Sequence, residues 1–133
     1  MADAPIDLLE NVPLFSDMKS KELKRISQAM TEKRAEPGQT ITEEGKKGVG
    51  FFVIESGTAR VSVNGEEKRT LGPGDYFGEI ALISDVPRTA TVTAETPLRC
   101  WALAPWDFRP LVQENAKVAW RLLDSVAKIV ADG

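Results

Sequence analysis

The chain has 133 residues, of which 42% are hydrophobic and 28% charged, enough for one domain that buries roughly two thirds of its unfolded surface. Its net charge of −3 argues against nucleic acid as a direct partner. The chain has no His and one cysteine, Cys100, which excludes His-based catalytic triads and internal disulfides and leaves no basis for a zinc site.

The N-terminal part, residues 1–31, is predicted to be helical. Its first residues are acidic, unlike a signal peptide, and no apolar run in the chain reaches membrane-spanning length. We therefore expect a cytoplasmic chain with no membrane partner. Residues 6–15 contain Pro13 and predict a short helix or an extended arm, and residues 20–30 place apolar side chains at helical spacing.

Residues 32–103 alternate short apolar runs with glycines and turns, a pattern typical of a sandwich or barrel. The pair Asn64 and Gly65 predicts a hairpin turn, because both residues tolerate positive φ. Cys100 stands in a strand-like run and is expected to be a small core residue. The expected strands are residues 40–42, 51–55, 59–63, 68–71, 90–94 and 99–103.

Residues 104–133 return to helical patterns. Asp107 is expected to cap a short helix with Pro110 in its first turn, where a missing N–H is harmless. A second, amphipathic helix should run to Ala131. The whole chain, 1–133, is thus predicted to be a single, mainly β domain: an antiparallel β-roll with an N-terminal helix and two C-terminal helices.

The segment from Phe77 to Val92 carries the chemistry. It places a lone Glu, Glu79, and a lone Arg, Arg88, on a stretch that should otherwise be buried, and buried charges need partners. Backbone N–H groups at the turn that begins at Phe77 can cradle an anion, and the Arg88 guanidinium suits phosphate oxygens. The Glu79 carboxylate suits a sugar hydroxyl, so the segment predicts a site for a small phosphorylated sugar.

The order and spacing of these sixteen residues resemble the phosphate-binding cassette of cyclic nucleotide-binding domains, as in catabolite activator protein and protein kinase A regulatory subunits. Further matching motifs, at Pro13 to Phe15, Phe51 to Gly57 and Leu71 to Tyr76, extend the resemblance across the chain. The resemblance implies a jelly roll, or double-stranded β-helix, that binds cAMP or cGMP. It implies no catalytic residue, no metal and no catalytic cofactor.

Carried over residue by residue, the resemblance assigns Arg88 to the exocyclic phosphate oxygens and Glu79 to the ribose 2′-hydroxyl. It assigns backbone N–H groups near Ile80 and Ala81 to the phosphate. Thr89 either hydrogen-bonds the phosphate or the amine of a syn guanine, or simply starts a strand. The expected nucleotide-binding residues are Phe77, Gly78, Glu79, Ile80, Ala81, Pro87, Arg88, Thr89 and Ala90.

The last helix is the expected source of a lid over the purine. Its candidate lid residues are Val126, Ile129 and Val130, and packing of the same stripe into the core is the alternative. The three tryptophans are expected to be core or interface anchors, with Trp106 also suited to the surface.

Three functional interpretations remain beside a cyclic nucleotide sensor that signals to an unknown protein effector through its C-terminal helix. A cupin-type enzyme is disfavoured because cupins usually hold metals with His. A vestigial nucleotide site is disfavoured because Glu79 and Arg88 are both present. A fragment of a larger regulator stays open, although Met1 and the short tail favour a complete chain. Homodimer formation also stays open.

Overall fold

Eight strands form two four-stranded antiparallel sheets in the computed structural model, which describes residues 3–46, 50–83 and 87–132. One sheet has the order β1-β8-β3-β6 and the other β2-β7-β4-β5. The strands are β1 (Thr31–Ala35), β2 (Thr40–Thr42), β3 (Phe51–Ser56), β4 (Ala59–Val63), β5 (Glu66–Leu71), β6 (Tyr76–Phe77), β7 (Thr91–Ala94) and β8 (Leu98–Leu103). The predicted antiparallel β-roll is confirmed.

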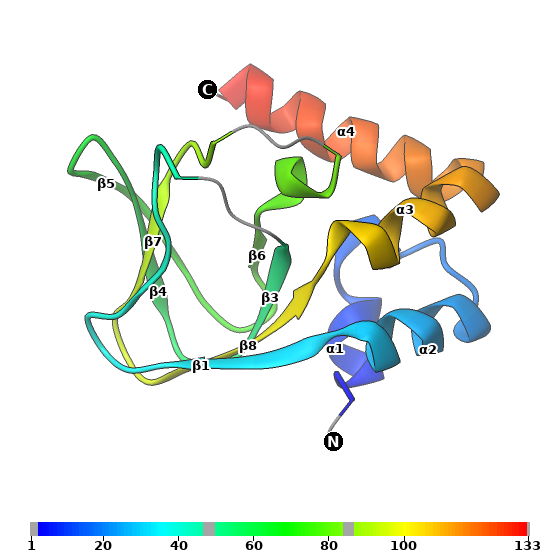
Figure 1. Cartoon of the computed structure of the whole chain (residues 1–133), viewed down its shortest axis with the longest axis horizontal. Helices are drawn as coiled ribbons and strands as arrows, with labels where there is room; N and C mark the ends of the chain where they lie inside the picture. Colours follow the sequence, from blue (N-terminus) through cyan, green and yellow to red (C-terminus); the bar gives the residue numbers. More distant parts are fainter. Residues whose placement is uncertain (1–2, 47–49, 84–86, 133) are drawn as a thin grey trace.

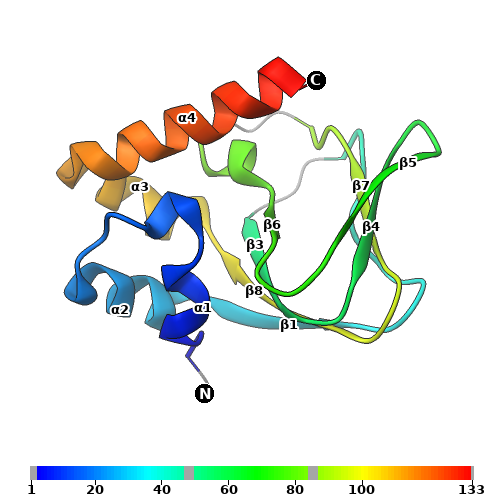
Figure 2. The same cartoon turned by 180° about the vertical axis from the view of Figure 1, so that it is seen from behind.

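Helices occupy the other half of the molecule, and α4 runs along the rim from there toward the roll (Figures 1 and 2). The helical segments are α1 (Ile6–Glu10), η1 (Pro13–Phe15), α2 (Ser20–Ala29), η2 (Glu79–Leu82), α3 (Pro105–Glu114) and α4 (Ala116–Asp132), where η denotes a 3₁₀ helix. Within the described ranges, no helix is long and apolar enough to cross a membrane.

Strand β3 joins two hydrophobic cores because successive side chains of a strand point to opposite faces. Phe51 and Val53 belong to the core shared with the helices, where Phe51 meets Phe15 edge-on with ring centroids 5.8 Å apart. Phe52 and Ile54 belong to the core inside the roll. The cassette that leaves β6 therefore starts where the two cores meet.

The interior of the roll is apolar on both sheets, and Cys100 lies in it as expected. Its thiol is buried, and burial raises its pKa to about 11. The predicted hairpin turn is also confirmed, since Asn64 and Gly65 both adopt positive φ, 54° and 79°. Of the tryptophans, only Trp101 is a core residue, whereas Trp106 and Trp120 are exposed.

The start of α3 differs from the prediction. Ala104, in an extended conformation, precedes the helix, Pro105 takes its first position, and Asp107 lies inside the first turn rather than capping it. Pro105 already has the φ that a helix needs and loses no hydrogen bond there, so it starts the helix without a polar cap. Pro110 lies in the helix interior, where its missing N–H deprives the carbonyl of Trp106 of a partner.

Candidate functional site

The cassette, residues 77–92, runs from the end of β6 into the start of β7, and its residues 84–86 are outside the described part of the chain. Phe77 anchors its beginning: the ring is buried and stacks on Phe52, with centroids 4.9 Å apart and planes 12° from parallel. Helix η2 follows directly and carries Glu79 in its first position. Strand β7, in which the cassette ends, begins at Thr91, so Thr89 does not start a strand.

Gly78 brings the cassette close to the loop before β3. Its φ of 92° lies in the left-handed region, which favours glycine. A β-carbon at this position would stand 2.8 Å from Arg88 Nη1 and 2.8 Å from the Gly50 carbonyl oxygen. Gly78 therefore serves both the turn and the close approach of Arg88.

Arg88 is held firmly by backbone groups. Its Nη2 donates to the Gly50 carbonyl at 2.8 Å, its own N–H donates to the Lys46 carbonyl at 2.9 Å, and its carbonyl accepts from the Gly45 N–H at 2.8 Å. The connection between β2 and β3 thus supplies the groups that fix both the backbone and the guanidinium of Arg88.

The Arg88 guanidinium has no counter-ion among the described residues: none of the ion pairs there includes it. Its Nε is buried and has no hydrogen-bond acceptor in that part of the structure. Burial lowers the pKa of Arg88, because the interior disfavours the charged form, but a guanidinium stays protonated at neutral pH. A fixed, half-buried cation with a donor that the described residues leave unused is suited to bind an anion.

Glu79 is buried, with 8% of its surface exposed. The hydroxyl of Ser125, from α4, donates to its Oε2 at 3.0 Å. Tyr76 lies beside this pair: burial and, second, the negative charge of Glu79 raise the pKa of its phenol, while Lys128 and Ser125 oppose the shift. The carboxylate that the sequence assigned to a sugar hydroxyl is therefore engaged by a hydroxyl of the protein itself.

The other cassette residues differ in accessibility. Pro87 and Thr89 are exposed, whereas Ala90 is half-buried against the core of the roll. Of the two backbone donors assigned to the phosphate, the Ala81 N–H already donates to the Gly78 carbonyl at 3.1 Å. The Ile80 N–H lies at the amino end of η2, where a helix provides no acceptor of its own.

The expected lid residues differ in burial in this structure. Val126 is half-buried and packs against the core shared by the helices, and Val130 is 73% exposed. The side chain of Ile129 lies outside the described part of the structure. The alternative of core packing thus holds for Val126.

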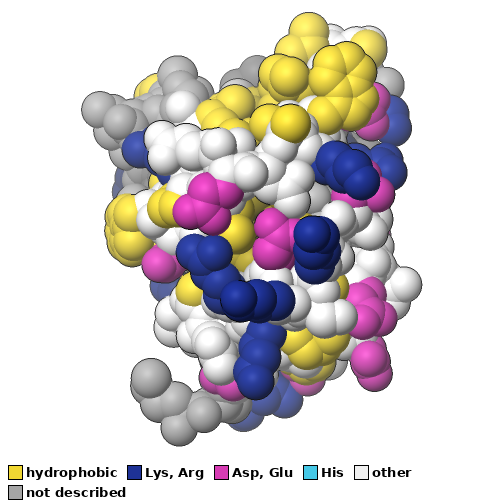
Figure 3. Space-filling view, turned by 90° about the vertical axis from the view of Figure 1, so that its right-hand side faces the viewer, with side chains coloured by type: hydrophobic (Ala, Val, Ile, Leu, Met, Phe, Trp, Pro, Cys, Tyr) yellow, Lys and Arg dark blue, Asp and Glu magenta, His cyan; other side chains and the backbone are white. Residues whose placement is uncertain are grey.

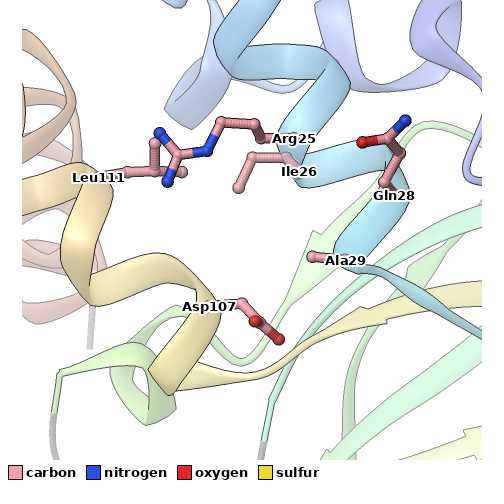
Figure 4. Close-up of a pocket in the computed structure, with 6 residues that line it drawn as sticks. All are labelled: Arg25, Ile26, Gln28, Ala29, Asp107 and Leu111. Atoms are coloured by element: carbon pink, nitrogen blue, oxygen red, sulfur yellow. The ribbon is translucent and has the colours of Figure 1, made fainter.

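A separate cavity of about 330 Å³ lies between α2 and α3 (Figure 4). Arg25 and Gln28 from α2 and Asp107 from α3 contribute its polar groups, and it shares no residue with the cassette. No group of three or more His, Cys, Asp or Glu in the described ranges could hold a metal ion.

The structure adds three residues that the sequence did not reveal: Gly50, which orients Arg88, and Ser125 and Tyr76, which contact or flank Glu79. Gly50 has a φ of 114° and is buried. For Gly50, the one available sequence signal was a glycine shortly before an apolar strand. For Ser125, the sequence showed only a polar residue in an amphipathic helix.

Comparison with known proteins places this site in a family. The sequence profile of the cyclic nucleotide-binding domain matches residues 32–115. The chain is 43% identical to the cAMP-dependent protein kinase regulatory subunit of Yarrowia lipolytica over 106 residues, 78% of this chain and 28% of that protein. It is 41% identical to the cGMP-dependent protein kinase of Eimeria tenella over 92 residues, 69% of this chain and 9% of that protein.

Among solved structures, the chain resembles the regulatory domain of Toxoplasma gondii PKA co-crystallised with cAMP. The TM-score is 0.73 at 34% identity, over 79% of this chain and 42% of that chain. The chain belongs to the cyclic nucleotide-binding domain family. It spans less than a third of the length of the two kinase relatives described above.

Proposed function

We propose that this domain binds one 3′,5′-cyclic purine nucleotide, cAMP or cGMP, and that Arg88 holds its phosphate. The carrying observation is the half-buried guanidinium, fixed on the Gly50 carbonyl with a buried Nε that has no acceptor among the described residues. A planar donor group of this kind suits two phosphate oxygens at once. The exposed Pro87 and Thr89 leave the approach to Arg88 accessible.

Glu79 is the group we propose for the ribose 2′-hydroxyl. Glu79 lies within ten residues of Arg88 along the cassette. Gly78, which directly precedes η2, lies against the Arg88 guanidinium and so brings Glu79 and Arg88 to the same region. A carboxylate accepts hydrogen bonds and donates none, so it favours a ligand with a free hydroxyl. A contact between Glu79 and the 2′-hydroxyl favours binding of a ribonucleotide over its 2′-deoxy analogue.

The base is less constrained than the sugar phosphate. The names of the kinase relatives mention both cAMP and cGMP. Thr89 is exposed and next to Arg88, so its hydroxyl suits either the phosphate or the exocyclic amine of a syn guanine. We infer that the domain takes a purine and that Thr89 contributes to the choice between the two.

We propose a regulatory rather than a catalytic role, in which occupancy of the site reaches a protein effector through α4 in the cytoplasm. The named relative from Yarrowia lipolytica is a regulatory subunit. A nucleic-acid partner is not supported by the net charge of −3, and on the face in Figure 3 Asp and Glu side chains lie among the Lys and Arg side chains. Nucleic-acid surfaces are usually contiguous basic patches.

A thermal-unfolding panel tests the proposal. The chain is heated with cAMP, cGMP, 2′-deoxy-cAMP and 5′-AMP, each up to millimolar concentration. At about 100 times its dissociation constant, a true ligand stabilises the fold by about 2.7 kcal/mol. We expect stabilisation by cAMP, cGMP or both, and less by the other two. Equal melting temperatures in all samples would overturn the proposal.

A further inference from the structure

The hydrogen bond between Ser125 and Glu79 joins two elements that the chain places far apart. Ser125 lies in α4 and Glu79 begins η2, the two residues are 46 positions apart, and the donor–acceptor distance is 3.0 Å. Glu79 is 8% exposed, so little of its surface is open to a ligand. The group that bonds its carboxylate directly is the Ser125 hydroxyl.

A serine hydroxyl and a sugar hydroxyl are the same kind of donor. Each is a neutral O–H that gives one hydrogen bond to an ionised carboxylate. Exchanging one for the other therefore leaves the bonding of Glu79 nearly unchanged. What differs is the protein: Ser125 loses its partner, and the part of α4 that it holds loses an attachment.

Helix α4 is attached unevenly to the rest of the molecule. Its first half is anchored by Val118 and Leu122, which are buried in the core shared by the helices. Beyond Leu122, Val126 is only half-buried, and Lys128 and Val130 are exposed. Helix α4 passes over η2 (Figures 1 and 2). Ser125 is thus a main attachment of the second half of this helix to the cassette.

We propose that Ser125 is an internal competitor for the nucleotide. In the free protein its hydroxyl occupies Glu79, and the ribose 2′-hydroxyl displaces it, which releases the second half of α4 while Val118 and Leu122 hold the first half. This inference rests on the proposed function. It makes Ser125 a residue that sets affinity without belonging to the ligand contacts.

The direct test is calorimetric titration of the parent and Ser125→Ala with cAMP and with cGMP. Without the competing hydroxyl, Ser125→Ala should bind about tenfold more tightly, equivalent to about 1.4 kcal/mol. Ser125→Thr keeps a hydroxyl at this position and should bind as the parent does. Asp124→Ala is the matched control, since it brings the same helix-favouring residue to the adjacent exposed position without touching Glu79.

Amide hydrogen exchange gives a second readout that needs no ligand. Ser125→Ala alone should speed exchange in residues 126–131, and nucleotide should do the same in the parent, whereas residues 116–122 should change little. Unchanged exchange in the free variant would overturn the attachment that the proposal assigns to Ser125.

The outcomes separate this inference from the proposed function. If the parent binds and Ser125→Ala binds equally or more weakly, the competition is wrong and the nucleotide site stands. If only Ser125→Ala binds, the competition is supported in its strongest form. If neither protein binds either nucleotide, the proposed function fails and the competition fails with it.

Discussion

Gly78 and Arg88 are in such close contact that a β-carbon on residue 78 would lie 2.8 Å from Arg88 Nη1. The same β-carbon would lie 2.8 Å from the Gly50 carbonyl that accepts the Arg88 hydrogen bond. The turn that starts the cassette and the cation that ends it are therefore one packed unit, and neither can change without the other.

Gly78→Ala should weaken nucleotide binding by at least tenfold, because the added methyl group displaces the Arg88 guanidinium. It should also lower the free energy of unfolding by about 1–2 kcal/mol, the cost of a left-handed residue with a side chain. Gly74→Ala is the matched control: its φ is 88°, and a β-carbon there meets nothing within 4 Å. Titration and chemical denaturation measure both effects. Equal binding losses in the two variants would mean that backbone strain, not collision with Arg88, is responsible.

Arg88→Met should abolish binding while hardly changing the stability of the free protein. The bound phosphate loses its counter-charge, which costs about 3–5 kcal/mol of binding. The fold loses one hydrogen bond to Gly50 but also a half-buried charge that has no counter-ion among the described residues, and these effects oppose each other. We expect the free energy of unfolding to stay within about 1 kcal/mol of the parent. A larger drop, with binding retained, would make Arg88 a structural residue.

Glu79→Gln should weaken nucleotide binding by about 1.5–3 kcal/mol, the scale of a hydrogen bond to an ionised group. The substitution also weakens the competing hydrogen bond from Ser125. In a protein that keeps Ser125, this weaker competition offsets part of the loss of nucleotide affinity. The loss should therefore be larger when measured with Ala at position 125. Binding to 2′-deoxy-cAMP should be nearly unaffected, and an equal loss for both ligands would argue against a ribose contact.

The buried Cys100 gives the fold a specific sensitivity to alkali. Its pKa is about 11 in the folded protein against an ordinary value of 9.0, so the unfolded chain releases the proton first as pH rises. The contribution of the protonated thiol to the free energy of unfolding is constant below pH 9. As pH rises to about 11 this contribution is lost, and the free energy of unfolding falls by up to about 2–3 kcal/mol. Chemical denaturation of Cys100→Ala should show a flatter decline over this range than the parent. Parallel declines would show that the thiol does not titrate this way.

The parts of the molecule that the sequence predicts are those encoded locally. The cassette is one continuous segment, and the Asn64 and Gly65 turn is a property of two adjacent residues. Strand β4 was predicted with the bounds that it has, Ala59–Val63, because alternation and a following turn define it. The confirmed roll follows from such short, clearly bounded strands.

Strand β1 was missed for a physical reason. Its sequence is dominated by charged residues, which are unusual in a strand, but it is an edge strand that pairs only with β8. Glu32 in β1 binds Arg99 in β8, so the charges that hide the strand in the sequence help to pair it in the structure. Such a pattern has no apolar alternation to detect.

The contacts that complete the site were missed because they are long-range. Arg88 and Gly50 are 38 positions apart, and Glu79 and Ser125 are 46 apart. No spacing or local propensity encodes either pair, since both depend on how the roll brings its loops under α4. The sequence therefore predicts candidate binding residues, whereas the structure reveals the contacts that hold them.

The central claim, that this domain binds a cyclic purine nucleotide through its cassette, is tested most directly by calorimetric titration of the purified chain with cAMP and with cGMP. We expect one site per chain for at least one of the two nucleotides, and loss of that binding heat in Arg88→Met. No heat from either nucleotide up to millimolar concentration, or undiminished binding by Arg88→Met, would contradict the account.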